Sequence, residues 1–231
     1  QEGTGGTKEM RARRCDFHAH TTLSDGDLLP MELIRRAVAS DHAAIALTDH
    51  ASFSNIEWMV KSLVRDCERA ESWGIQAIPG VELTHVPVRH IDEAVSLARK
   101  KGAELVVVHG ETPVEPVEPG TDHVSVMNPD VDILAHPGMI SEEDVQLAAE
   151  NGVYLEISCR KGHSLSNGHV ARLARAEGAK LLVNTDAHSP SDLSTMEFAN
   201  KVGRGAGMTP EEVRVALVTN PAELLKKLKR L

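Results

Sequence analysis

The chain has 231 residues, of which 41% are hydrophobic, so it can bury one sizeable core. Its 25 basic and 34 acidic residues give a net charge of −9, which argues against the basic face that duplex DNA or RNA requires. A small anion held by metal ions stays compatible with this acidic balance.

Cysteine content and hydropathy predict a soluble, cytoplasmic protein without a membrane partner. Three cysteines are too few for a disulfide framework and indicate a reducing compartment. No apolar run approaches the ~18 residues of a membrane span, and no signal-peptide pattern opens the chain. The oligomeric state is left open by these features.

Residues 1–10 are rich in Gly and Thr and lack periodicity, so we expect a disordered leader or cloning remnant there. A single barrel domain is expected over residues 11–231. Within it, short apolar runs alternate with helical patterns, which is typical of repeated βα units and a mostly parallel sheet.

Capping residues mark the expected ends of several helices. Helices are expected at residues 30–40, 54–73, 91–101, 142–150 and 168–177, with two more beginning near 210 and 221. Ser141 is the expected N-cap of the helix at 142–150. Asn167 is the expected N-cap of the helix at 168–177, and Gly178 is expected just after the last turn of that helix. The segment 111–129 has four prolines and no clear period. It predicts a long loop, placed where a lid or substrate-recognition segment would lie.

Six expected strands lead into His, Asp or Glu. The first leads into the motif at 16–20, and the runs 43–47, 75–78, 105–108, 131–135 and 181–183 are followed by Asp49-His50, Glu82, His109, His136 and Asp186-Ala187-His188. Side chains at the C-terminal ends of barrel strands point into the barrel mouth, where such enzymes place their chemistry. Imidazole and carboxylate bind divalent transition metals. The pattern therefore predicts a polynuclear metal site.

The motif Asp16-Phe17-His18-Ala19-His20 is the strongest single signal. Alternation along a strand puts His18 and His20 on one face, and two inward-facing imidazoles are costly to bury without a coordinated ion. Asp16 shares that face and is expected to orient a histidine. Six of the twelve histidines lie at strand ends, so chance clustering is a poor explanation.

These residues carry a family resemblance. His18-Ala19-His20, Ser24-Asp25-Gly26, Thr48-Asp49-His50, Gly80-Val81-Glu82, His109, His136-Pro137-Gly138 and Asp186-Ala187-His188 resemble the motifs of the polymerase and histidinol phosphatase (PHP) superfamily. The match runs from about Asp16 to His188. Within the superfamily, the chain resembles the stand-alone, archaeal-type histidinol-phosphatase-like members. It implies an α/β fold, a distorted (β/α)7 barrel with a metal site at the C-terminal strand ends.

The resemblance also implies a trinuclear site. His18, His20, Glu82 and Asp186 would hold the first metal; Glu82, His109 and His136 the second; and Asp25, His50 and His188 the third. The family often has His where Asp25 stands, and the harder carboxylate ligand shifts the third position toward manganese or iron rather than zinc. The expected cofactors are two or three divalent ions, zinc, manganese or iron.

A basic turn follows a further expected strand, 153–158. Arg160, Lys161 and His163 are expected to bind substrate phosphate, because guanidinium grips phosphate oxygens as a bidentate fork. A solvated turn is the alternative. Among the other histidines, His42 is expected at the surface and His90 and His123 in loops. His85 has a lesser chance of facing the mouth.

The predicted activity is hydrolysis of a phosphomonoester of a small phosphorylated metabolite, using a metal-bridging hydroxide activated at near-neutral pH. Glu82 and Arg160 are the expected catalytic residues, Arg160 by neutralising charge on the phosphoryl oxygens. A phosphodiesterase or nuclease acting on nucleic-acid ends is one alternative, disfavoured by the net charge and 3% aromatic content. A non-catalytic, metal-stabilised subunit is the other, disfavoured by the complete ligand set.

Overall fold

The protein is a nearly closed parallel barrel of seven strands, as the sequence predicts. The computed structural model describes residues 12–230, so the expected leader at 1–10 lies outside the described residues. The barrel strands are β1 (Arg14–Asp16), β2 (His42–Leu47), β4 (Gln76–Leu83), β5 (Leu105–His109), β6 (Ile133–Ala135), β7 (Tyr154–Ser158) and β8 (Leu181–Asn184), paired in that order. A short strand β3 (His50–Ala51) also pairs with β4. A parallel bridge between Ala19 and Ala187 brings the two edges together.

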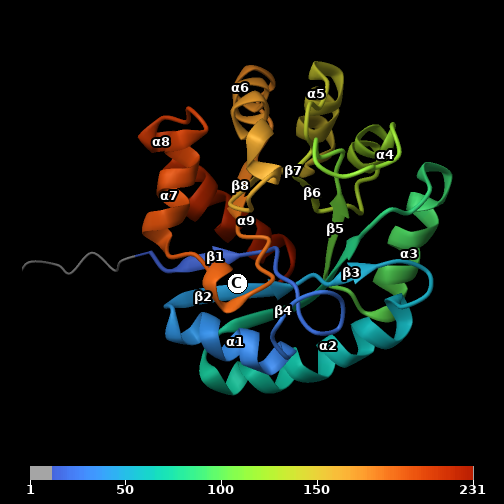
Figure 1. Ribbon diagram of the computed structural model, residues 1–231, viewed down its shortest axis with the longest axis vertical. Helices are drawn as coiled ribbons and strands as arrows, with labels where there is room; N and C mark the ends of the chain where they lie inside the picture. The colour runs from blue at the N-terminus through green and yellow to red at the C-terminus, as the bar shows by residue number, and fades with distance from the viewer. Residues whose placement is uncertain (1–11, 231) are drawn as a thin grey trace, which may run out of the picture.

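Helices surround the barrel, and those from α1 to α7 each follow a strand in the chain (Figure 1). They are α1 (Pro30–Ala39), α2 (Ile56–Ala70), α3 (Ile91–Lys101), α4 (Thr121–Met127), α5 (Glu142–Asn151), α6 (Asn167–Glu177), α7 (Met196–Gly205), α8 (Pro210–Arg214) and α9 (Asn220–Lys227). A π-helical turn, Val215–Thr219, connects α8 to α9. Within residues 12–230, no helix combines the length and the apolar character needed to cross a bilayer.

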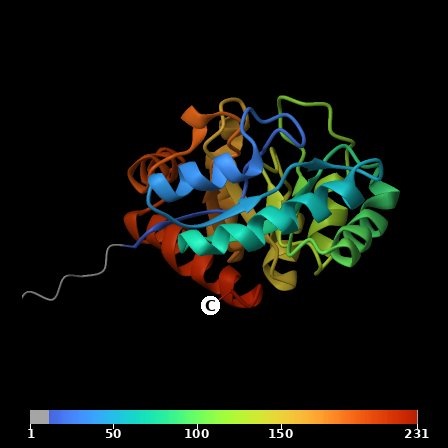
Figure 2. The same cartoon turned by 90° about the horizontal axis from the view of Figure 1, so that it is seen from below.

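Two apolar layers hold the fold, as expected for strands buried on both faces. In β5, Leu105 and Val107 belong to the cluster inside the barrel, whereas Val106 and Val108 pack with the surrounding helices. Leu224 and Leu225 of α9 join the inner cluster. Helix α9 therefore closes one end of the barrel, and the loops after the strands gather at the opposite end (Figure 2). That opposite end is the mouth.

The predicted helix ends are mostly confirmed. Ser141 caps α5 by accepting from the Asp144 amide, and Gly178 follows α6 in the left-handed conformation. The cap assigned to Asn167 is wrong, because helix α6 begins at that residue. The Asn167 side chain instead bonds the backbone N–H and C=O of Ser158, which fixes the turn after β7.

The prolines of the segment 111–129 predict a loop throughout, but only its first half is one. Its second half forms α4, which the Glu111 carboxylate stabilises by accepting from the backbone N–H groups of Gly120 and Asp122. Helix α7 was not predicted either, since its buried residues are only the small Ala199 and Gly203. A helix that buries small side chains gives a weak hydrophobic period.

Replacing Gly138 with Ala should destabilise the fold strongly. Gly138 has φ +59°, and an added Cβ would lie 2.0 Å from the Glu111 carbonyl oxygen. Gly152 is the matched control, since its φ is +69° but nothing lies within 4 Å of its Cβ position. Backbone strain alone should cost about 1 kcal/mol in Gly152→Ala, whereas Gly138→Ala should lose about 3 kcal/mol or more. Urea unfolding measures both, and equal losses would show that the close approach to Glu111 does not matter.

Candidate metal centre at the barrel mouth

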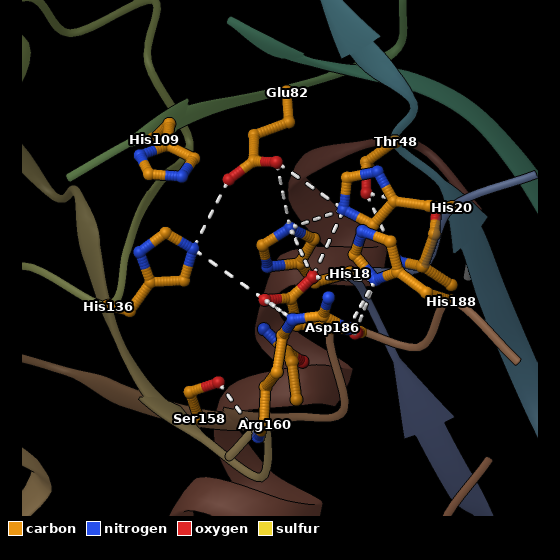
Figure 3. A network of polar contacts seen from close by, with 12 residues as sticks. His18, His20, Thr48, Glu82, His109, His136, Ser158, Arg160, Asp186 and His188 are labelled. Atoms are coloured by element: carbon orange, nitrogen blue, oxygen red, sulfur yellow. Dashed lines mark hydrogen bonds and ion pairs between the residues drawn. The ribbon is translucent and has the colours of Figure 1, made fainter. Parts of the chain in front are cut away.

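The structure brings all nine predicted metal ligands to the mouth. Figure 3 labels all of them except Asp25 and His50. His18 and His20 follow β1, and Asp25 lies in the next loop. The remaining six come from the ends of later strands: His50 in β3, Glu82 in β4, His109 in β5, His136 after β6, and Asp186 and His188 after β8.

Glu82 lies at the centre of the cluster and is fully buried. Its Oε2 is 3.2 Å from His18 Nε2, 3.4 Å from His20 Nε2 and 3.0 Å from His50 Nδ1. Its Oε1 is 3.4 Å from His136 Nε2. One carboxylate therefore faces four imidazoles from the ends of three other strands, an arrangement suited to bridging two cations.

Two further carboxylates also face imidazoles of the cluster. Asp186 Oδ1 lies 3.1 Å from His20 Nε2 and 3.6 Å from His18 Nε2. Asp25 lies at the rim, with Oδ1 3.2 Å from His188 Nε2 and Oδ2 3.5 Å from His50 Nε2. The contacts of Asp186 and of Asp25 correspond to the first and third ligand sets that the family resemblance implies.

The charges of the centre suit a cation. Burial alone would raise the pKa of Glu82, but the imidazoles of His18, His109 and His50 hold that pKa well below its usual value. Burial alone would likewise lower the pKa of His50, but Glu82 and Asp25 raise that pKa to about 10. The carboxylates of Glu82 and Asp25 thus favour the protonated form of His50, and a bound cation would replace that proton.

The hydrogen bonding of the buried atoms provides a direct test of fit. Neither Glu82 oxygen has a hydrogen-bond partner among the described residues, and His20 Nδ1 and His136 Nδ1 also lack one. Buried polar atoms are rarely left this way unless an ion or water completes them. Five groups of donor atoms each lie within 4.8 Å of one another, and three of them are His20, Asp25, His50 and His188; His18, His20 and Asp186; and His109, His136 and His163. The residues present therefore fit a cluster of divalent ions.

Glu156 is a site residue that sequence reasoning missed. Its Oε2 lies 2.8 Å from His18 Nδ1 and accepts a 3.0 Å bond from Asn184 Nδ2, and its side chain is fully buried. Holding Nδ1 leaves Nε2 of His18 facing the centre. The signal was available, since Glu156 is the only charged residue in the otherwise apolar strand β7.

The orienting role expected of Asp16 is not seen. Its Oδ1 accepts from the backbone N–H groups of Thr185 and His18 rather than from a histidine ring, its Oδ2 accepts from the Thr185 hydroxyl, and Arg14 Nη2 lies 3.9 Å from Oδ2. The strand ends at Asp16, so strict alternation does not continue to His18. Asp16 joins the segment after β1 to the segment after β8, and Glu156 does the orienting.

The basic turn after β7 divides into two parts. Arg160 Nη1 lies 2.7 Å from His188 Nδ1, and Arg160 Nε lies 3.7 Å from Asp186 Oδ2. Arg160 and the exposed Lys161 line a cavity beside the centre. His163 is instead buried against His136, with ring centroids 4.0 Å apart.

The other histidines fall outside the centre, with one exception. The expectation that His42 is at the surface is wrong: it begins β2 and is fully buried. His90 is half-buried at the end of the turn Val88–His90, and His123 is exposed on α4 rather than in a loop. His85 faces the mouth, with its ring centroid 5.3 Å from that of His109.

Glu115 was also not predicted. It lies in the first half of the segment 111–129, and its Oε2 is 3.0 Å from His109 Nε2 and 3.6 Å from His85 Nε2. The hydrogen bond with His109 is the main cause that lowers the Glu115 pKa to about 2. This part of the segment therefore reaches the mouth with an ionised carboxylate.

Replacing Glu156 with Gln should weaken metal binding without unfolding the protein. The amide keeps the shape of the side chain but cannot fix the His18 tautomer as a carboxylate does, and such partners typically change metal affinity ~10–100-fold. Competition with a chromogenic chelator measures the affinity. Glu68→Gln on the exposed face of α2 is the control. Wild-type affinity in Glu156→Gln would contradict the orienting role.

A parallel barrel with imidazoles and carboxylates at its strand ends defines a metal-dependent hydrolase of the barrel class. The model of the PHP domain matches residues 16–151, more than half of the chain. The chain therefore belongs to the PHP family and is a metal-dependent phosphoesterase of that family.

Relatives and solved structures agree with this assignment. An uncharacterized protein of Methanocaldococcus jannaschii is 50% identical over 93% of this chain and 100% of its own length. A probable phosphatase of Thermoanaerobacter sp. is 30% identical over 93% of this chain and 95% of its own length. The fold is also similar to that of histidinol phosphate phosphatase from Lactococcus lactis, solved with zinc, L-histidinol and phosphate. That match has a TM-score of 0.61 and 15% identity, and covers 85% of this chain and 95% of that one.

Proposed function

We propose that this protein hydrolyses a phosphomonoester of a small metabolite, with two or three divalent cations at the mouth. The observation that carries the proposal is the position of Arg160. On one side its guanidinium contacts the Asp186 carboxylate and the His188 imidazole. On the other side it lines a cavity of about 530 Å³. A cavity of this size fits a small organic molecule.

The chain offers ligands for zinc, manganese or iron. His18, His20, Glu82 and Asp186 would hold a first cation; Glu82, His109 and His136 a second; and Asp25, His50 and His188 a third. Such cations supply Lewis acidity and make water nucleophilic near neutral pH. The Asp25 carboxylate in the third set favours manganese or iron there.

Arg160 would hold the phosphoryl group from the cavity side. Its guanidinium donates to two phosphate oxygens in one plane, and the contact strengthens as negative charge grows on them. Its backbone N–H donates to Ser158 Oγ at 3.2 Å, which anchors the residue at the end of β7 (Figure 3). Arg160 therefore orients the ester with its phosphorus toward the buried carboxylates.

The leaving group would lie in the cavity. Leu193 and the half-exposed Phe198 supply apolar surface there, while Lys161, Ser191 and Thr195 supply polar groups. This mixed lining suits a compact organic alcohol. The net charge of −9 disfavours a nucleic-acid end, since single-stranded nucleic acids bind basic grooves lined with aromatic side chains.

A substrate screen tests the proposal. Purified protein loaded with manganese or zinc is assayed on phosphorylated metabolites, histidinol phosphate among them, on an aryl phosphate and on an oligonucleotide. We expect release of phosphate from at least one small monoester and none from the oligonucleotide. Cleavage of the oligonucleotide alone would favour a nuclease, and no turnover on any substrate would favour a non-catalytic subunit.

A further inference from the structure

His163 lies with two predicted ligands of the second cation. It opens the turn His163–Ser166 after β7, while His109 ends β5 and His136 follows β6. The ligand nitrogens of the three residues lie within 4.8 Å of one another, and all three are buried. Three adjacent strands therefore each contribute one imidazole to the same part of the mouth.

The Nε2 atoms of His163 and His136 point in the same direction. The two rings stack with centroids 4.0 Å apart and planes inclined by 13°. Asp186 Oδ2 lies 3.7 Å from His163 Nε2 and 3.8 Å from His136 Nε2. Both nitrogens thus lie beside the same Asp186 oxygen, and that of His136 is also 3.4 Å from Glu82 Oε1, a buried oxygen without a hydrogen-bond partner among the described residues.

The far side of the ring is held in the way that metal-binding histidines usually are. His163 Nδ1 shares a 2.6 Å hydrogen bond with Thr112 Oγ1, a buried hydroxyl. When Nδ1–H donates to Thr112, the lone pair of Nε2 faces the centre. In that tautomer Nε2 has no proton to donate to a phosphate oxygen.

We propose that His163 is a metal ligand that joins Glu82, His109 and His136 around the second cation. This replaces the phosphate-binding role that the sequence pattern had given it. Arg160 and Lys161 line the cavity where the leaving group is proposed to lie, and His163 does not. The inference rests on the cation site of the proposed function but not on its substrate.

Metal binding measured without substrate tests the inference. Cobalt(II) is titrated into metal-free wild type, His163→Asn and His163→Asp, following the visible absorption of the bound ion, with Lys161→Gln as the control. The Asn and Asp side chains have nearly equal volume, but only the carboxylate is a strong ligand. We expect His163→Asn to bind one cation about 100-fold more weakly, and His163→Asp and Lys161→Gln to bind it nearly as wild type does. Thr112→Val should weaken binding roughly 10-fold by freeing the ring.

Circular dichroism shows whether each variant folds, and the folded His163→Asp protein keeps the comparison informative if the Asn variant does not fold. Wild-type affinity and an unchanged cobalt spectrum in His163→Asn would overturn the proposal. Equal loss in the Asn and Asp variants would overturn it as well, because the ligand chemistry would then not matter. An absence of phosphatase turnover would contradict the proposed function but leave these metal affinities as the test of His163.

Discussion

Glu82→Gln should reduce turnover to about one thousandth or less while the barrel stays folded. The four imidazoles around the carboxylate face its two oxygens at 3.0–3.4 Å, so Glu82 is placed to lie between the cations that we propose. The amide has nearly the same shape but lacks the negative charge. The loss should therefore be one of metal content as well as of rate.

Folding should persist because the barrel is held by its two apolar layers rather than by Glu82. Elemental analysis, circular dichroism and steady-state kinetics on one phosphomonoester are measured for wild type, Glu82→Gln and Glu82→Asp. The shorter carboxylate of Glu82→Asp should retain part of the metal. If Glu82→Gln kept most of the wild-type rate, the bridging role would be wrong.

The ligand cluster was predictable because it depends on topology and residue type alone. Parallel strands all end at the same side of a barrel, so His109 and His136 had to meet once their strands were recognised. The same argument brought Glu82 and Asp186 to the mouth. The seven-strand barrel followed from the alternation of apolar runs and helices, and from the family resemblance.

The residues that hold the ligands in place were harder to predict, because their roles depend on side-chain direction. Asp16 seemed to share a face with His18, but the strand ends at Asp16 and its carboxylate turns to Thr185. From the sequence, Glu156 is an isolated acidic residue in a buried strand. Only the fold shows that its Oε2 lies 2.8 Å from His18 Nδ1. His42 was assigned to the surface because no local pattern reports that β2 begins there.

The residues of the basic turn after β7 point to two different places, although they are close together in the sequence. Arg160 and His163 are three residues apart, which suggested one phosphate clamp. The residue between Lys161 and His163 is Gly162, with φ +93°, a left-handed conformation that turns the chain. The turn sends Arg160 and Lys161 toward the cavity and His163 toward His136.

Arg160→Ala should lower kcat/KM by roughly 10²–10³, or ~2–4 kcal/mol of transition-state stabilisation. The guanidinium contact strengthens as charge moves onto the phosphoryl oxygens, so it acts on the transition state more than on ground-state binding. Arg160→Lys should restore only part of the rate, because a single ammonium cannot reproduce the planar fork. Metal content should not fall, since arginine cannot be a ligand.

Kinetics of these variants separate phosphate binding from a surface role for Arg160. Arg172→Ala, which removes an exposed arginine of α6, is the control and should leave kcat/KM unchanged. Because Nη1 of Arg160 lies 2.7 Å from His188 Nδ1, the alternative is that loss of the guanidinium acts through that ring. In that case Arg160→Ala would lose a cation along with its rate. A loss of rate at full metal content assigns the effect to the phosphoryl group, and a loss smaller than about threefold would show that Arg160 does not bind it.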